Sequence, residues 1–219
     1  MKTAQDIQVA KYWNEVAHDF DAIYTGQNKS AFMRALDQWL RKDIYGRYDW
    51  VMRKSGDVTG KTICDIGCGS GRFVAGLAKR GAAKVHGIDV APEMLKLARE
   101  LMIKEGVAGK TEFTELDIID WKRNDVYDET IAIGFWDYFA DPTERLQIIR
   151  KMTRQRFLSA WPRLWTWRAP VRKVRLTALG CPVYFFSKSE VVGYLEKTGF
   201  KVQSVETVGK LHCVDAVPV

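Results

Sequence analysis

The 219-residue sequence lacks any apolar run near the ~20 residues that a membrane-spanning helix needs. Its amino-terminal stretch, MKTAQDIQVAKYW, has no apolar core of signal-peptide length, so we expect no secretion by that route. Internal repeats, low-complexity tracts and Pro- or Ser-rich linkers are also missing, which favours a single domain over residues 1–219. Cysteine is scarce and has neither CxxC spacing nor histidine partners, so we expect reduced thiols, no metal and a cytoplasmic location. The four cysteines are Cys64, Cys68, Cys181 and Cys213.

Acidic residues are absent between Glu144 and Glu190, although the whole chain has 34 basic and 27 acidic residues. That interval holds eleven lysines and arginines, so the rest of the chain carries −4 against a total of +7. We therefore expect residues 145–188 to form a basic partner surface, without a general affinity for nucleic acids. The positive residues are Arg145, Arg150, Lys151, Arg154, Arg156, Arg163, Arg168, Arg172, Lys173, Arg175 and Lys188.

The sequence does contain a regular alternation of short apolar runs and amphipathic segments. Residues 4–24 and 30–54 carry apolar positions at helical spacing. Strands are expected at 61–66, 84–90, 111–117, 130–135, 156–160, 201–208 and 211–217, and helices at 73–80, 93–104, 142–153 (capped by Asp141) and 188–198. This alternation predicts a doubly wound, Rossmann-like α/β fold with seven strands, mostly parallel, ending in an antiparallel hairpin joined by Gly209.

A glycine-rich turn follows the first expected strand, where the sequence reads ICDIGCGSGRF. Glycines at alternate positions allow a sharp turn and let a ligand approach the main-chain N–H groups. Asp89 stands twenty residues past Gly69, at the end of the next expected strand, where a carboxylate can accept both hydroxyls of a ribose. The turn therefore predicts a site for a nucleotide-like ligand.

The details of this turn favour S-adenosylmethionine over a dinucleotide. The dinucleotide fingerprint GxGxxG has a sixth-position glycine, which is Arg72 here. Asp65 precedes the turn by two residues, and a carboxylate there suits an ammonium better than a pyrophosphate. A Tyr-x-x-x-Lys pair at Tyr184 and Lys188 follows Cys-Pro in a strand-like stretch, which disfavours hydride transfer by a nicotinamide oxidoreductase.

Five segments together resemble the class I S-adenosylmethionine-dependent methyltransferases, in the small-molecule branch that includes quinone and magnesium-protoporphyrin methyltransferases. They are Ile63–Phe73, Val85–Ala98, Glu115–Ile118, Asp128–Pro142 and, as a helical lid, Tyr12–Tyr24. The resemblance implies a lid at 1–55, a cofactor core at 56–160, an acceptor-side cap at 161–187 and a closing helix and hairpin at 188–219. It also implies S-adenosylmethionine as cofactor and S-adenosylhomocysteine as product.

The resemblance assigns a cofactor role to residues along the ends of the first four strands. The glycine turn and Asp65 would hold the aminoacyl end, Asp89 the ribose, and Asp117 and Ile118 the adenine. Phe135 and Trp136 would lie near the methyl group. The full set is Tyr12, Asp65, Gly67, Cys68, Gly69, Gly71, Arg72, Asp89, Val90, Met94, Asp117, Ile118, Phe135 and Trp136.

The catalytic residues are less defined, because the loop after the fourth strand lacks the histidines common in small-molecule members. We interpret His86 and His212 as structural, which leaves His18 as the candidate base, with Tyr24 and Tyr138 as candidates for orienting the acceptor. The candidate acceptor residues are Trp165, Arg168 and Arg172, from a basic, Trp-rich connection.

These residues predict methyl transfer to a small, anionic aromatic or apolar acceptor, most often on oxygen. An amphipathic cap with solvated arginines and docking at a membrane interface remain open as other uses of the Trp-rich connection. The alternative function is a non-catalytic or RNA-directed protein with the methyltransferase fold that uses residues 145–188 as its partner surface.

Overall fold

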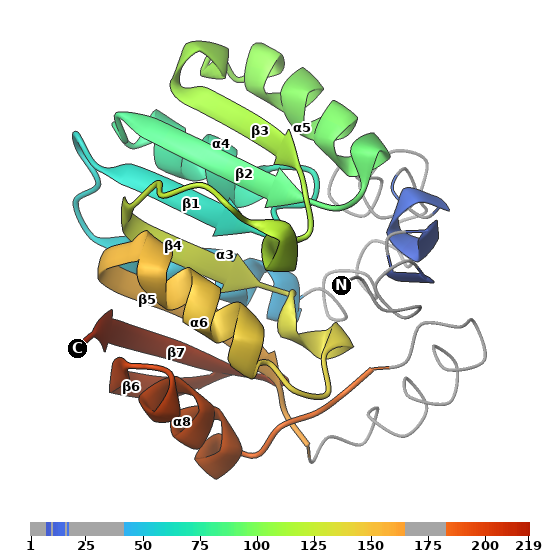
Figure 1. The fold of residues 1–219 in the computed structure, drawn as a ribbon. Helices are drawn as coiled ribbons and strands as arrows, with labels where there is room; N and C mark the ends of the chain where they lie inside the picture. Colours follow the sequence, from blue (N-terminus) through green and yellow to red (C-terminus); the bar gives the residue numbers. More distant parts are fainter. Residues whose placement is uncertain (1–7, 10, 16, 18–41, 165–182) are drawn as a thin grey trace.

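The computed structural model describes residues 8–9, 11–15, 17, 42–164 and 183–219 (Figure 1). Seven strands form one mixed sheet in the order β3-β2-β1-β4-β5-β7-β6. The first five are parallel, and β7 is antiparallel to both β5 and β6, which confirms the predicted fold class. The strands are β1 (Thr62–Ile66), β2 (Lys84–Asp89), β3 (Thr111–Glu115), β4 (Tyr127–Ile133), β5 (Thr153–Pro162), β6 (Phe200–Val208) and β7 (Leu211–Pro218).

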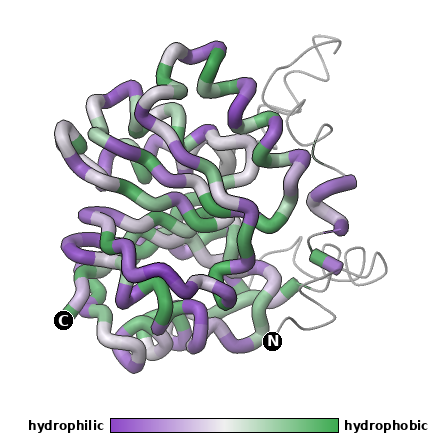
Figure 2. Tube along the Cα trace, turned by 45° about the horizontal axis from the view of Figure 1, so that its top comes forward, coloured by the Kyte–Doolittle hydropathy of each residue, from purple (hydrophilic) through white to green (hydrophobic). Residues whose placement is uncertain are grey.

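Helices cover both faces of this sheet because successive strand residues point to opposite sides. Ile63 belongs to the core cluster under α3, α4 and α5, whereas its neighbour Cys64 belongs to the cluster under α6 and α8. Figure 2 shows hydrophobic stretches along the central strands, with hydrophilic and hydrophobic residues alternating along the covering helices. The described helices are α3 (Lys42–Ser55), α4 (Arg72–Lys79), α5 (Pro92–Lys104), α6 (Thr143–Met152) and α8 (Lys188–Lys197).

Short helical turns and a short N-terminal helix complete the described elements. The 3₁₀ turns are η1 (Ala108–Lys110), η2 (Ile118–Asp120) and η3 (Trp136–Tyr138). Helical residues between positions 8 and 17 lie beyond the carboxyl ends of the parallel strands, at the right of Figure 1. No helix of the described residues is both long and apolar enough to cross a bilayer.

The predicted element boundaries differ most at β4 and β5, which both begin three residues earlier than expected. α6 passes into β5 without a loop, because the Thr153 hydroxyl donates to the Ile149 carbonyl at 2.7 Å and bonds Thr130 Oγ1 in β4 at 2.7 Å. Asp141 Oδ1 accepts the Thr143 N–H at 2.9 Å, as expected of a cap at the start of α6. α8 begins with a capping box between Ser187 and Glu190 that the sequence analysis did not use.

The structural interpretation of His86 is confirmed. Its Nδ1 lies 2.6 Å from the Tyr127 hydroxyl and its Nε2 lies 2.8 Å from Thr114 Oγ1, and the ring is buried. Burial lowers the pKa of His86. His212 lies on β7, and burial likewise lowers its pKa.

The basic interval does not form one surface over its described part. Arg150 donates to the Gly199 and Val219 carbonyls at 2.7 and 2.5 Å, on the α8 side of the sheet. Other cations of the interval pair within the chain: Arg145 with Asp117, Arg154 with Asp128 and Arg156 with Asp215. Contacts within the chain therefore occupy Arg145, Arg150, Arg154 and Arg156, and a partner surface over this interval stays a prediction.

Candidate functional site

The glycine turn predicted after β1 is present and lies at the carboxyl ends of β1, β2 and β4. Gly67, Gly69 and Gly71 have φ values of 71°, 52° and 76°, a region that favours glycine. A Cβ on Gly67 would lie 2.9 Å from Cδ2 of Phe135, which leaves no room for a side chain. The main chain of the turn therefore forms a close-packed cradle in front of α4.

Asp89 holds this turn from the end of β2. Its Oδ2 accepts the Gly69 N–H at 2.8 Å and its Oδ1 accepts the Ala91 N–H at 2.9 Å. Burial raises the pKa of Asp89, while hydrogen bonds from backbone N–H groups oppose that shift. Each carboxylate oxygen has a second lone pair, so Asp89 can order the turn and accept two ligand hydroxyls together.

Asp65, at the end of β1, is a buried carboxyl group that lacks a full set of partners. Its side chain is 1% exposed, and no described residue gives its Oδ2 a hydrogen bond. Burial and the charge of Asp89 raise the pKa of Asp65 to about 8, against the opposing charge of Arg47. A buried polar atom without a partner is costly, and a cationic ligand group would satisfy it.

Arg47 is a cation of the candidate site that no sequence motif singles out. It lies on α3, and its Nη1 is 3.0 Å from the position that a Cβ on Gly134 would take, just after β4. Its charge lowers the pKa of Asp65. The helix comes this close because Gly46 packs against β6, where a Cβ would lie 2.9 Å from Val208 Cγ1. Helical periodicity placed residue 47 on a helix, but only the packing of α3 shows which of its cations faces the site.

The residues predicted to hold the adenine, Asp117 and Ile118, and Met94, predicted to pack near the ribose, gather at the ends of β2 and β3. Met94 is buried, with its Sδ 4.0 Å from the position of a Cβ on Gly69, and Ile118 is buried in η2. Asp117 begins η2, and its Oδ1 accepts the Ile119 N–H at 3.2 Å. The structure therefore brings these residues and the glycine turn to one edge of the sheet. Val90 follows β2 at the same edge.

The two aromatic residues predicted near the methyl group have different places. Phe135 is partly exposed and lies against Gly67, with its ring 4.9 Å from that of Phe139. Trp136 is fully buried and stacks on Trp161 at 4.2 Å with an interplanar angle of 6°. The prediction that Trp136 lines the site is therefore corrected, because its indole packs inside the core.

The described part of the N-terminal helix lies across this edge of the sheet. Trp13 packs on one side against the cluster of Ala17, Ala91 and Met94, and on the other its ring is 6.1 Å from that of Tyr138. The Glu93 N–H in the first turn of α5 donates to Asn14 Oδ1 at 3.1 Å, because neither Ala91 nor Pro92 supplies a capping side chain. The helix therefore bridges α5 and η3 above the glycine turn, with the Tyr12 ring 5.5 Å from that of Trp13.

Of the remaining predicted residues, some have structural positions and the others lie outside the described ranges. Cys68 is buried, with its Sγ 3.7 Å from the Gly69 carbonyl, and burial raises its pKa, so it packs as an inert thiol. Arg72 begins α4. The residues outside the described ranges are His18, Tyr24, Trp165, Arg168 and Arg172.

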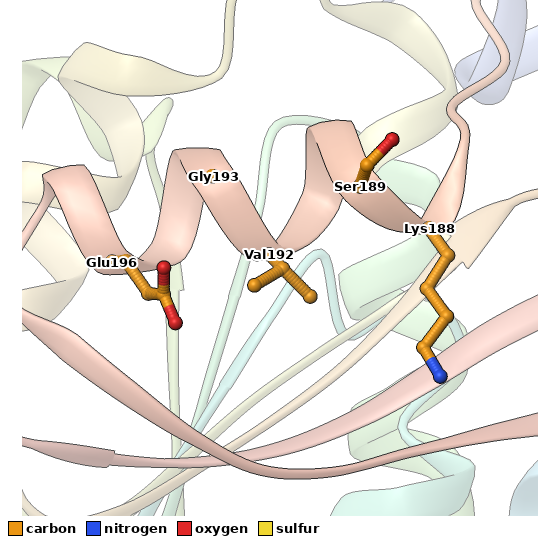
Figure 3. A pocket seen from close by; sticks show the side chains of 5 residues that line it. All are labelled: Lys188, Ser189, Val192, Gly193 and Glu196. Carbon is orange, nitrogen blue, oxygen red and sulfur yellow. The ribbon is translucent and has the colours of Figure 1, made fainter.

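A hollow lies along the outer side of α8 (Figure 3). The described residues that line it all come from this one helix: Lys188, Ser189, Val192, Gly193 and Glu196. The sticks in Figure 3 do not converge on one point, so this hollow lacks the features of a cofactor or acceptor site.

Comparison with known proteins settles the family. Residues 57–173, more than half of the chain, match the family model described as a methyltransferase domain. The chain belongs to this methyltransferase family. The matched residues span the glycine turn, Asp89, Asp117 and the loop after β4, so the family assignment and the geometry of the site coincide.

Two curated methyltransferases illustrate what this chain is similar to. A ubiquinone biosynthesis O-methyltransferase of Aeromonas salmonicida is 34% identical over 108 residues, 49% of this chain and 45% of that protein. A probable fatty acid methyltransferase of Pseudomonas putida is 27% identical over 136 residues, 61% of this chain and 34% of that protein. The chain thus spans less than half the length of these curated relatives.

A solved structure matches the whole fold. Magnesium protoporphyrin IX methyltransferase from Synechocystis PCC 6803, solved with bound S-adenosylhomocysteine, superposes with a TM-score of 0.78 at 17% identity. The match covers 98% of this chain and 100% of that chain. At this identity the likeness establishes the shared fold alone.

Proposed function

We propose that this protein transfers a methyl group from S-adenosylmethionine to a small-molecule acceptor. The observation that carries the proposal is the pairing of a buried carboxyl, Asp65, with the Asp89-ordered glycine turn. A cationic ligand group suits the Asp65 carboxyl group, and ribose hydroxyls suit the Asp89 carboxylate. The cofactor supplies an activated methyl group on its sulfonium, so the protein has to align it with the acceptor and exclude water.

In this proposal each end of the cofactor has its own residues. Asp65 accepts from the ammonium and Arg47 donates to the carboxylate of the aminoacyl end. Asp89 accepts from both ribose hydroxyls, while Asp117 accepts from the adenine amino group above Ile118. The cofactor can approach the main chain of the turn closely because its glycines carry no side chain.

The acceptor is proposed to be flat, apolar and anionic, with methylation on oxygen. Support comes from the aromatic side chains that surround the strand ends: Tyr12, Trp13, Phe135, Tyr138 and Phe139. Such rings exclude water and contact a planar acceptor over a large area. An acceptor that is already an oxyanion needs no general base, which fits a loop after β4 without histidine.

The proposal is tested by calorimetric titration of the whole chain with S-adenosylmethionine and S-adenosylhomocysteine, with NADH as control. We expect micromolar binding of both sulfur ligands and none of NADH. Binding of NADH instead, or no binding of either sulfur ligand by folded protein, would remove the proposal. With binding established, the acceptor screen starts from phenolic and carboxylic acids of planar or apolar shape, with product identified by mass spectrometry.

Arg47→Leu is expected to weaken S-adenosylhomocysteine binding by about 10- to 100-fold, the loss typical for one charge-assisted contact. The affinity for 5′-methylthioadenosine, which has no carboxylate, should stay within about twofold, since nothing at the nucleoside end changes. Arg53→Leu is the matched control, because Arg53 lies on the same helix but pairs at 2.8 Å with Glu206 on the exposed surface. Equal losses for both ligands would contradict the role of Arg47.

A further inference from the structure

Arg145 is a buried cation at the adenine end of the site. It lies in the first turn of α6 and is 7% exposed, whereas most surface arginines keep their guanidinium in water. Its Nη2 lies 3.6 Å from Asp117 Oδ2, and its Cζ lies 3.8 Å from the centre of the Phe139 ring. One guanidinium therefore links the loop after β3 to the loop after β4.

These contacts divide the two oxygens of Asp117 between different partners. Oδ1 accepts the Ile119 N–H, and Oδ2 faces the guanidinium. A carboxylate held against a cation only accepts hydrogen bonds, so it accepts from an amino group and repels a carbonyl oxygen. Without the cation a buried carboxylate is costly, and protonation relieves that cost. A protonated carboxyl group can then donate to a carbonyl oxygen as well.

We propose that Arg145 is a positioning residue that makes the site selective for a 6-aminopurine over a 6-oxopurine. It acts through Asp117 and does not need to touch the ligand. The inference rests on the proposed function, in which Asp117 accepts from the adenine amino group. The charge pattern of the sequence alone placed Arg145 on a partner surface, and the proposal gives this residue a role inside the cofactor site.

Phe139 explains why the residue is an arginine. The planar guanidinium stacks on the ring and keeps its edge free for a carboxylate, which the compact ammonium of lysine cannot do with the same geometry. Arg145 therefore fixes Asp117 in one direction and the loop after β4 in the other. Arg145→Lys retains the charge and loses this planar arrangement.

The test compares the affinities of S-adenosylhomocysteine and S-inosylhomocysteine, which differ at purine position 6 and in the proton that the 6-oxopurine carries on N1. Wild type is expected to prefer the adenine ligand by about 10- to 100-fold, the range for one hydrogen bond to a charged group. In Arg145→Met the ratio of the two affinities should fall to about threefold or less. In Arg145→Lys this ratio should lie between those of wild type and Arg145→Met. The ratio is the decisive reading, because a purely structural defect lowers both affinities together.

Arg150→Met provides the matched control. Arg150 lies on the same helix and its Cζ is 6.0 Å from the Phe200 ring, far from the strand ends that carry the site. Its ratio should equal that of wild type even if its melting temperature falls. If Arg145→Met does not fold, Arg145→Lys decides, because it retains the charge and loses the planar contact with Phe139, and a ratio equal to that of wild type would overturn the role of Arg145.

The outcomes separate the inference from the proposed function. A strong wild-type preference that persists in both Arg145 variants would overturn the role of Arg145 and leave the cofactor assignment intact. A wild-type ratio near one, with tight binding of both ligands, would overturn the pairing of Asp117 with adenine and this inference with it. No binding of S-adenosylhomocysteine by wild type would overturn the proposed function itself.

Discussion

Asp65→Asn is expected to lower the affinity for S-adenosylmethionine by about 10²- to 10³-fold and to stabilise the unliganded protein. The first effect follows from removing the negative partner of a buried ammonium, a change that costs about 3–5 kcal/mol in comparable buried pairs. The second follows from the position of Asp65 at the end of β1, where its carboxyl is 1% exposed. The substitution keeps the shape of the side chain and removes its titration.

The sign of the stability effect depends on pH. The folded-state pKa of Asp65 is about 8, above the ordinary 3.8, so the folded protein retains a proton that the unfolded chain has lost. Stability from this group is fully present below pH 3.8 and is lost as the pH rises toward 8, at about 1.4 kcal/mol per unit. Asparagine does not titrate, so the variant does not lose this stability. Its free energy of unfolding should exceed that of wild type by a few kcal/mol at pH 8 and by almost nothing near pH 4.

Denaturant unfolding at the two pH values measures the stability effect, and calorimetry measures the affinity. The affinity of 5′-methylthioadenosine, which lacks the aminoacyl end, should be nearly the same in both proteins. A variant that loses both ligands equally, or that is less stable than wild type at pH 8, would show that Asp65 supports the turn instead of binding an ammonium. Wild-type binding should also release a proton below pH 8, visible as a dependence of the binding heat on the buffer.

The arrangement of the sheet was predictable because its signals are local. The sequence shows apolar runs of strand length that are separated by glycines and by helices with caps. These runs determine the alternation of strands and helices, and that alternation determines the parallel sheet. The glycine turn and Asp89 were predictable for the same reason, since a strand, a turn and an acid at the next strand end lie within about 25 residues. Boundaries at β4 and β5 were missed because the Thr130–Thr153 contact forms only between strands.

The residues that sequence reasoning misplaced depend on packing between distant elements. Arg47 reaches the site only because Gly46 lets α3 approach β6, more than 150 positions later in the chain. Trp136 follows β4 as a site residue would, but the direction of its indole is set by Trp161 at the end of β5. In the sequence Arg145 is part of a basic run, whereas in the structure it is buried and lies against the carboxylate of Asp117. Composition gives the charge of a segment and does not show where each charged side chain points.

Asp89→Ala is expected to have the largest effect on cofactor affinity, a loss of about 10²- to 10⁴-fold. Two hydrogen bonds from ribose hydroxyls to a charged acceptor contribute about 1.5–3 kcal/mol each. The substitution also removes the acceptors of the Gly69 and Ala91 N–H groups, at 2.8 and 2.9 Å, so the glycine turn loses its tie to β2. Unlike Asp65→Asn and Arg47→Leu, this variant should lose S-adenosylhomocysteine and 5′-methylthioadenosine alike, because both carry the ribose.

Asp57→Ala is the matched control for Asp89→Ala. Asp57 Oδ1 accepts the Thr59 N–H at 2.9 Å, the same two-residue contact that Asp89 makes with Ala91, but in an exposed turn before β1. Losing such a contact alone should leave both affinities within about twofold of wild type. If Asp89→Ala binds both ligands as well as Asp57→Ala does, the ribose is held elsewhere, and the acid at the end of β2 only shapes the turn. If it loses both while retaining its fold by circular dichroism, the carboxylate orders the turn and binds the ligand with the same two oxygens.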